Sequence, residues 1–145
     1  MSEVGLARIY VRDTGTPRGR GVFAGQEIRA GELIETSPVV VIDAPFERLP
    51  IVLQRMVFSW GAGSGSQEAH ALALGYGSLY NGANPANVRF ERNVGELLVR
   101  FFAARDIACG EELTINYSTG DGSAIATDDA WFAEHGIRTS LDSAR

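Results

Sequence analysis

One tyrosine in this sequence stands where it could take part in chemistry. Tyr117 ends residues 109–117, in which a glycine turn leads into two acids and then an alternating strand. Leu113 and Ile115 face one side of that strand, and a polar Ser/Thr/Gly/Asp loop follows the tyrosine. A tyrosine in this position can aim its hydroxyl into a cleft. The alternative is a half-buried tyrosine that closes an amphipathic edge strand.

Two other stretches can contact a ligand through backbone or amide groups. Residues 18–24 read Arg-Gly-Arg-Gly-Val-Phe-Ala, and glycines at this spacing let another group approach the backbone closely. The third glycine and the following helix of a dinucleotide-binding fingerprint are missing, so an ordinary tight turn is the alternative. Residues 75–88 are dense in asparagine and glycine after aromatic residues. Their amides can meet a ligand's polar edge, or they form a coil of Asx turns.

The composition excludes several classes of protein and site. The length of 145 residues suits one compact domain with its own core. Cys109 is the single cysteine, so no internal disulfide and no cysteine-rich zinc site can form, and we read His70 and His135 as surface or structural residues. No apolar run reaches membrane-spanning length and no signal segment is apparent, so we expect a cytoplasmic or otherwise intracellular protein. A net charge of −5 disfavours direct nucleic-acid binding and suits a basic partner.

Short strands must position these groups. Alternation and turn residues predict strands over 6–12, 22–24, 33–35, 39–42 and 57–60, and a hairpin built from 88–92 and 96–105. We expect short helices over 46–55 and 128–135, a helical turn over 69–74 and a mobile Gly/Ser loop over 61–67. Many short strands with few helices favour a mainly β domain of several small sheets.

In order and spacing, the three stretches resemble the SET domain, the fold of most protein lysine methyltransferases. Residues 19–24 look like the family's G-x-G-x-F-A element. Residues 81–88 stand where the family carries N-H-S-x-x-P-N-V, and residues 110–117 are similar to its G-E-E-L-T-x-D/N-Y. Residues 73–81 look like the small stand-alone SET proteins of bacteria and viruses.

The resemblance implies a fold, a domain division and an activity. The fold is a β-clip-like arrangement of several short sheets with few short helices, and its C-terminal segment is tucked through a loop as a pseudoknot. We expect the SET domain over residues 1–118 and a post-SET-like tail that covers the active site over 119–145. The implied activity is methyl transfer from S-adenosylmethionine to a lysine of a basic protein such as a histone, and no metal is needed.

The family's functional positions carry over onto a defined set of residues. Tyr117 takes the place of the catalytic tyrosine, where the donor pocket meets a narrow lysine channel. The implied cofactor-binding residues are Gly19, Arg20, Gly21, Tyr80, Asn81, Gly82, Tyr117 and Trp131. The implied substrate-binding residues are Tyr76, Leu79 and Phe132.

The sequence also departs from the family pattern. The family's histidine and serine are Gly82 and Ala83 here, and its proline is Ala86. Glycine can still supply backbone contacts, from a less rigid loop. Thr36 replaces an aromatic residue of many nuclear members, which leaves the degree of methylation open. An active methyltransferase and a degenerate SET module that binds a basic peptide or the cofactor without turnover both stay open. The channel can be closed by the tail or by a second subunit in a homodimer.

A set of acidic side chains surrounds the expected channel exit in sequence. They form either a solvated face or a docking surface for a basic tail. The set consists of Glu111, Glu112, Asp121, Asp128, Asp129 and Glu134.

Overall fold

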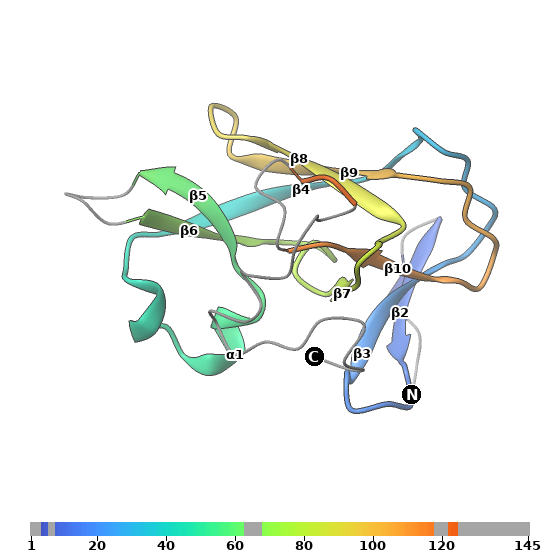
Figure 1. Ribbon diagram of the computed structural model, residues 1–145, viewed down its shortest axis with the longest axis horizontal. Helices are drawn as coiled ribbons and strands as arrows, with labels where there is room; N and C mark the ends of the chain where they lie inside the picture. Colours follow the sequence, from blue (N-terminus) through green and yellow to red (C-terminus); the bar gives the residue numbers. More distant parts are fainter. Residues whose placement is uncertain (1–3, 6–7, 63–67, 118–121, 125–145) are drawn as a thin grey trace.

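The chain folds into two sheets of short strands. The computed structural model describes residues 4–5, 8–62, 68–117 and 122–124. Within these residues the strands form two five-stranded sheets, and the helices are limited to two segments of a single turn (Figure 1). The expected mainly β architecture with several short sheets and few helices is therefore confirmed. No helix in this part of the chain has the length and apolar character needed to cross a membrane.

The first sheet brings together the three stretches that the sequence singled out. Its order is β1-β2-β3-β10-β7. β10 pairs antiparallel with β3 and parallel with β7, so the G-x-G element and the 81–82 segment lie on either side of the strand that leads to Tyr117. The strands are β1 (Val4–Gly5), β2 (Ile9–Asp13), β3 (Arg20–Ala24), β10 (Glu112–Ile115) and β7 (Asn81–Gly82).

The second sheet has the order β5-β6-β4-β9-β8. Its strands are β5 (Phe58–Ala62), β6 (Glu68–Ala73), β4 (Leu33–Ile42), β9 (Leu98–Ala103) and β8 (Val88–Asn93). The predicted hairpin is present, with Val88 opposite Ala103 and Asn93 opposite Leu98. β4 is continuous where the sequence predicted two pieces. A shift in its register between Leu33 and Glu35 leaves Glu35 buried.

Two predictions about helices were wrong. The helix expected over 46–55 is two short pieces, η1 (Phe46–Arg48) and α1 (Ile51–Gln54), because Pro50 has no N–H to continue a helix and stands at the N-cap of α1. The helical turn expected over 69–74 is strand β6. Its inward residues are small alanines, and His70 on the other face is also buried, against the ring of Phe46. The segment therefore lacks the alternation of apolar and polar residues that predicts a strand. The helix expected over 128–135 and most of the 61–67 loop lie outside the described residues.

One hydrophobic core joins the two sheets. Ile9, Val22 and Leu113 of the first sheet belong to the same buried cluster as Phe90 and Phe101 of the second. β10 also lies beside β8, where the sheets meet.

Residues 122–124 lie along the segment that precedes and begins β8. Ala86 donates its backbone N–H to the Ala124 carbonyl at 2.8 Å, and Phe90 donates to the Gly122 carbonyl at 3.0 Å. Gly122 has a φ of +83°, and a Cβ there would collide with the Phe90 carbonyl. This part of the C-terminal segment is therefore held directly behind the residues that follow β7.

Candidate functional site

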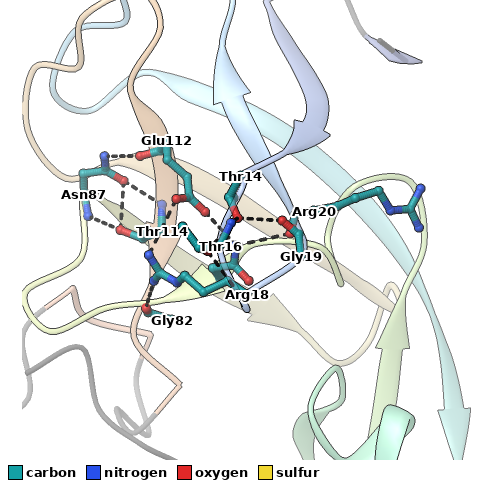
Figure 2. Close-up of polar contacts among 10 residues, drawn as sticks. Thr14, Thr16, Arg18, Gly19, Arg20, Gly82, Asn87, Glu112 and Thr114 are labelled. Carbon is teal, nitrogen blue, oxygen red and sulfur yellow. Dashed lines mark hydrogen bonds and ion pairs between the residues drawn. The ribbon is translucent and has the colours of Figure 1, made fainter. Parts of the chain in front are cut away.

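The turn between β2 and β3 holds the G-x-G element in a fixed shape. Thr14 donates to the Gly19 carbonyl twice, from its backbone N–H at 2.8 Å and from its hydroxyl at 2.7 Å. Gly19 in turn donates its N–H to the Thr16 carbonyl at 3.0 Å. Its φ of +77° lies in the region that favours glycine. The turn therefore presents Arg18 to Gly21 on an ordered backbone (Figure 2).

The side chains of β7 and β10 meet over the backbone of β3. The Asn81 amide nitrogen donates to Glu112 Oε2 at 2.7 Å and to the Arg20 carbonyl at 3.2 Å. A Cβ at Gly21 would lie 2.5 Å from Glu112 Oε2, so a larger residue there would displace the Glu112 carboxylate from this position. Three of the predicted cofactor-binding residues, Arg20, Gly21 and Asn81, are thus brought together.

Arg18 completes this cluster, and the sequence analysis did not predict it. Its Nη2 donates to the Gly82 carbonyl at 2.6 Å, and its Nη1 lies 3.6 Å from Glu112 Oε1 (Figure 2). The side chains of Arg18 and Glu112 are only 22% and 18% exposed, so this ion pair is largely shielded from solvent. The signal available in the sequence was an arginine directly before the first glycine, followed much later by an acid on the polar face of β10.

A pocket opens between the G-x-G turn, helix α1 and the segment before β7. Its volume is about 370 Å³, within the range of roughly 300–1,000 Å³ typical of small-molecule sites. The pocket is lined by four residues predicted from the sequence, Arg20, Leu79, Tyr80 and Asn81, and by residues of α1, which were not predicted. The other lining residues are Pro17, Arg18, Ile51, Val52, Arg55, Met56 and Ser78.

Tyr117 is connected to this pocket through Tyr80, although it does not itself line it. It follows the end of β10, is half-buried, and packs its ring at 5.6 Å from that of Phe58. Its hydroxyl donates to the backbone carbonyl of Tyr80 at 2.9 Å. Because Tyr80 lines the pocket, the predicted catalytic hydroxyl of Tyr117 is hydrogen-bonded to a lining residue of the predicted cofactor pocket.

Tyr80 is held from its other end by a buried carboxylate that the sequence analysis missed. The Tyr80 hydroxyl donates to Glu35 Oε1 at 2.7 Å, and the Tyr76 N–H donates to Glu35 Oε2 at 2.8 Å. Burial raises the pKa of Tyr80 well above its ordinary value, and the adjacent Glu35 raises it further. The same two causes raise the pKa of Tyr76. An acid within the apolar strand 33–42 was the only sequence signal for Glu35.

The remaining predicted residues are placed differently. Tyr76 is half-buried and packs against the core, but it does not line the pocket described above. Glu111 bonds Arg105 and Glu112 pairs with Arg18, so these two acids already have cationic partners. Trp131, Phe132 and the rest of the acidic set lie outside the described residues.

Comparison with known proteins identifies the family. The SET domain matches residues 19–118, which is more than half of the chain. The chain belongs to the SET domain family. It is 31% identical over 135 residues to a Schizosaccharomyces pombe histone-lysine N-methyltransferase specific for lysine 37 of histone H3, covering 91% of this chain and 82% of that protein.

Solved structures support the same fold. A crystallised Plasmodium falciparum protein, described as a candidate histone methyltransferase, aligns with a TM-score of 0.64 at 26% identity, covering 80% of this chain and 97% of that one. The Chaetomium thermophilum polycomb repressive complex 2 contains a similar fold, with a TM-score of 0.60 at 20% identity over 81% of this chain and 16% of that one. The resemblance predicted from the three motifs is therefore confirmed.

Proposed function

We propose that this SET protein is an S-adenosylmethionine-dependent protein-lysine N-methyltransferase that acts on a basic protein such as a histone. The observation that carries the proposal is the hydrogen bond from the Tyr117 hydroxyl to the Tyr80 carbonyl, beside a pocket that Tyr80 itself lines. The relative named as a histone H3 methyltransferase supports the substrate class.

The residues around the pocket fit the cofactor. The Arg18 Nε, on a residue that lines the pocket, is a buried donor with no hydrogen-bond partner among the described residues. Gly19, Arg20, Gly21, Tyr80, Asn81 and Gly82 are the residues that would hold the cofactor. When bound, S-adenosylmethionine would supply an electrophilic methyl group on a positively charged sulfur, which leaves as a neutral thioether when an amine attacks the methyl carbon.

Tyr117 orients the acceptor amine rather than acting as a strong base. Its hydroxyl donates its proton to the Tyr80 carbonyl, so toward an amine its oxygen acts as a hydrogen-bond acceptor. A lysine with an ordinary pKa of about 10.4 must lose a proton before it can attack. The ring of Phe58 beside Tyr117 provides apolar surroundings, which disfavour the charged ammonium form. Alignment and exclusion of water then provide the rate enhancement.

The test is transfer of labelled methyl from S-adenosylmethionine to a panel of basic proteins, histones included. The sequence contains no lysine, so label on a lysine side chain belongs to the acceptor and not to the enzyme. Tyr117→Phe should lower the rate by about 100-fold, the size expected when a reacting group is misplaced by about 1 Å. Tyr10→Phe, on β2 with its ring stacked on Phe23, is the matched control and should keep full activity.

Two results would contradict the proposal in different ways. Full activity of Tyr117→Phe would remove Tyr117 from the reaction. Absence of label on every acceptor, with cofactor binding intact by calorimetry, would favour a SET module that binds without turnover.

A further inference from the structure

Strand β7 is very short, although both of its residues belong to the candidate cofactor site. It has only two residues, Asn81 and Gly82, and its one strand partner is β10. The Asn81 side chain fastens the first residue to Glu112 and Arg20. Gly82 has no side chain to fasten the second, and Ala83 after it has no polar group on its side chain. The pairing of Gly82 with Ile115 of β10 is therefore its only restraint within the described part of the sheet, unless a side chain from elsewhere also holds it.

Arg18, in the turn between β2 and β3, makes this connection. Its Nη2 donates to the Gly82 carbonyl at 2.6 Å, a short hydrogen bond from a charged donor. Its Nη1 pairs with Glu112 Oε1, while the other oxygen of Glu112 accepts from Asn81. Both residues of β7 are therefore tied to the same carboxylate, Asn81 directly and Gly82 through Arg18. Figure 2 shows the contacts of Arg18 with Gly82 and Glu112.

The backbone that carries Arg18 is itself ordered. The Arg18 N–H donates to the Thr16 hydroxyl at 3.2 Å, and Thr16 also bonds the hydroxyl of Thr14 at 2.7 Å. Pro17 fixes one backbone angle of the same turn. The backbone therefore loses little conformational freedom when the guanidinium bonds Gly82, and the cost of fixing Arg18 is confined to its side chain.

We propose that Arg18 is a positioning residue for the cofactor pocket: its guanidinium, paired with Glu112, holds Gly82 against the G-x-G turn. The identity of the ligand rests on the proposed function, whereas the support of Gly82 does not. Removing Arg18 leaves the second residue of β7 held by its pairing with β10 alone, and the loosened segment then has to be ordered at each binding event.

Calorimetric titration with S-adenosylhomocysteine, the demethylated cofactor, measures the effect without any turnover. Arg18→Met should weaken binding by about 10- to 100-fold, which corresponds to the loss of one hydrogen bond to a charged group. Arg18→Lys should keep more of the affinity than Arg18→Met, because an ammonium group can keep one of the two contacts, to Gly82 or to Glu112, but not both. The double variant Arg18→Met/Glu112→Gln should lose less binding free energy for S-adenosylhomocysteine than the sum of the losses in the two single variants.

Arg8→Met is the matched control. Arg8 also bonds a backbone carbonyl, that of Leu33 at 2.8 Å, and pairs with a carboxylate, Glu32 at 2.8 Å, but it does not line the pocket. Its replacement removes the same charge and the same kinds of contact. It should leave the affinity for S-adenosylhomocysteine unchanged while lowering the melting temperature to a similar degree.

Hydrogen exchange of the Ala83 amide provides a second readout that needs no ligand. This amide donates to the Ile115 carbonyl at 3.0 Å, and it should exchange about 10-fold faster or more in Arg18→Met but not in Arg8→Met. Unchanged affinity together with unchanged exchange in Arg18→Met would overturn the inference and leave the proposed function standing. If the wild-type protein bound no S-adenosylhomocysteine, the proposed function would fail, and the exchange rate alone would decide whether Arg18 supports Gly82.

Discussion

At the scale of single residues, Glu35 shows how a buried charge can organise a site without an ion pair. None of the salt bridges among the described residues includes it, although it is buried. Its two oxygens accept instead from the Tyr80 hydroxyl and the Tyr76 N–H. Gly75, with a φ of +66°, allows this approach, since a Cβ there would lie 2.7 Å from Glu35 Oε2. Glu35 therefore fixes the segment that carries the pocket-lining Tyr80.

Replacing Tyr80 with phenylalanine tests this arrangement. The change leaves one oxygen of a buried carboxylate without its donor, which should lower the free energy of unfolding by about 1–3 kcal/mol. Urea denaturation at neutral pH measures the loss. Tyr10→Phe is the control and should change stability by less than about 0.5 kcal/mol, because no hydrogen bond of its hydroxyl is found within the described residues.

Wild type and Tyr80→Phe should also differ in how their free energy of unfolding changes with pH in alkaline solution. The pKa of Tyr80 is raised in the folded state by burial and by Glu35, so above the ordinary tyrosine value of 10.0 the unfolded chain releases a proton that the folded chain retains. The free energy of unfolding should therefore fall as the pH rises above about 10, and Tyr80→Phe should remove this part of the slope. Identical slopes for the two proteins would contradict the assignment of the raised pKa to Tyr80.

At the scale of elements, regular alternation made some strands predictable. Leu113 and Ile115 are fully buried on one face of β10, as the sequence indicated, and the β8–β9 hairpin follows the same rule. Alternation failed for β6, where Ala69, Ala71 and Ala73 face the core but His70 is buried as well. A strand covered on both faces has no polar side to reveal it.

The site was less predictable than the strands because its contacts join distant parts of the chain. Arg18 and Gly82 are 64 positions apart, and Tyr117 and Tyr80 are 37 apart. Local spacing contains no information about such pairs. The resemblance to the SET family identified Arg20, Asn81 and Tyr117, but it did not identify Arg18 or Glu35, whose roles depend on where the turn before β3 and strand β4 place them.

The turn before β10 gives a prediction for acid solution. Arg105 bonds the Glu111 carboxylate at 3.1 Å and the Ala108 N–H donates to it, and these contacts lower the pKa of Glu111 below its ordinary value of 4.5. The unfolded chain therefore takes up a proton at a higher pH than the folded chain does. The stability from Glu111 is present above about pH 4.5 and is lost as the pH falls through the lowered value.

Glu111→Gln should remove this increment, which we expect to be under about 1 kcal/mol because both partners are partly exposed. Denaturation of wild type and variant between pH 7 and pH 3 measures it, and the difference should shrink toward the acid end. Arg105→Gln removes the largest cause of the lowered pKa of Glu111. The difference in stability between wild type and Arg105→Gln should likewise shrink as the pH falls toward 3. A difference that stayed constant across this range would show that the turn does not depend on the charge of Glu111.

At the scale of the whole molecule, one aromatic cluster connects the second sheet to the site. The ring of Phe101 on β9 lies 4.6 Å from that of Tyr80, 6.2 Å from Phe58 and 6.3 Å from Phe90. Phe58 in turn contacts Tyr117. Tyr80 lines the pocket, so the packing of the core and the shape of the site cannot be varied independently.

Adjacent phenylalanines on β9 allow this dependence to be tested. Phe101 is fully buried, so Phe101→Ala should lower the free energy of unfolding by about 3–5 kcal/mol through the cavity that it leaves. Phe102 points to the other face, is half-buried and lies 4.3 Å beneath the guanidinium of Arg89, so Phe102→Ala should cost only about 1 kcal/mol. Urea denaturation measures both losses, and binding of S-adenosylhomocysteine should weaken in Phe101→Ala alone, since only that ring supports Tyr80. Equal losses of stability, or binding that is unchanged in a folded Phe101→Ala protein, would show that the core and the site are independent.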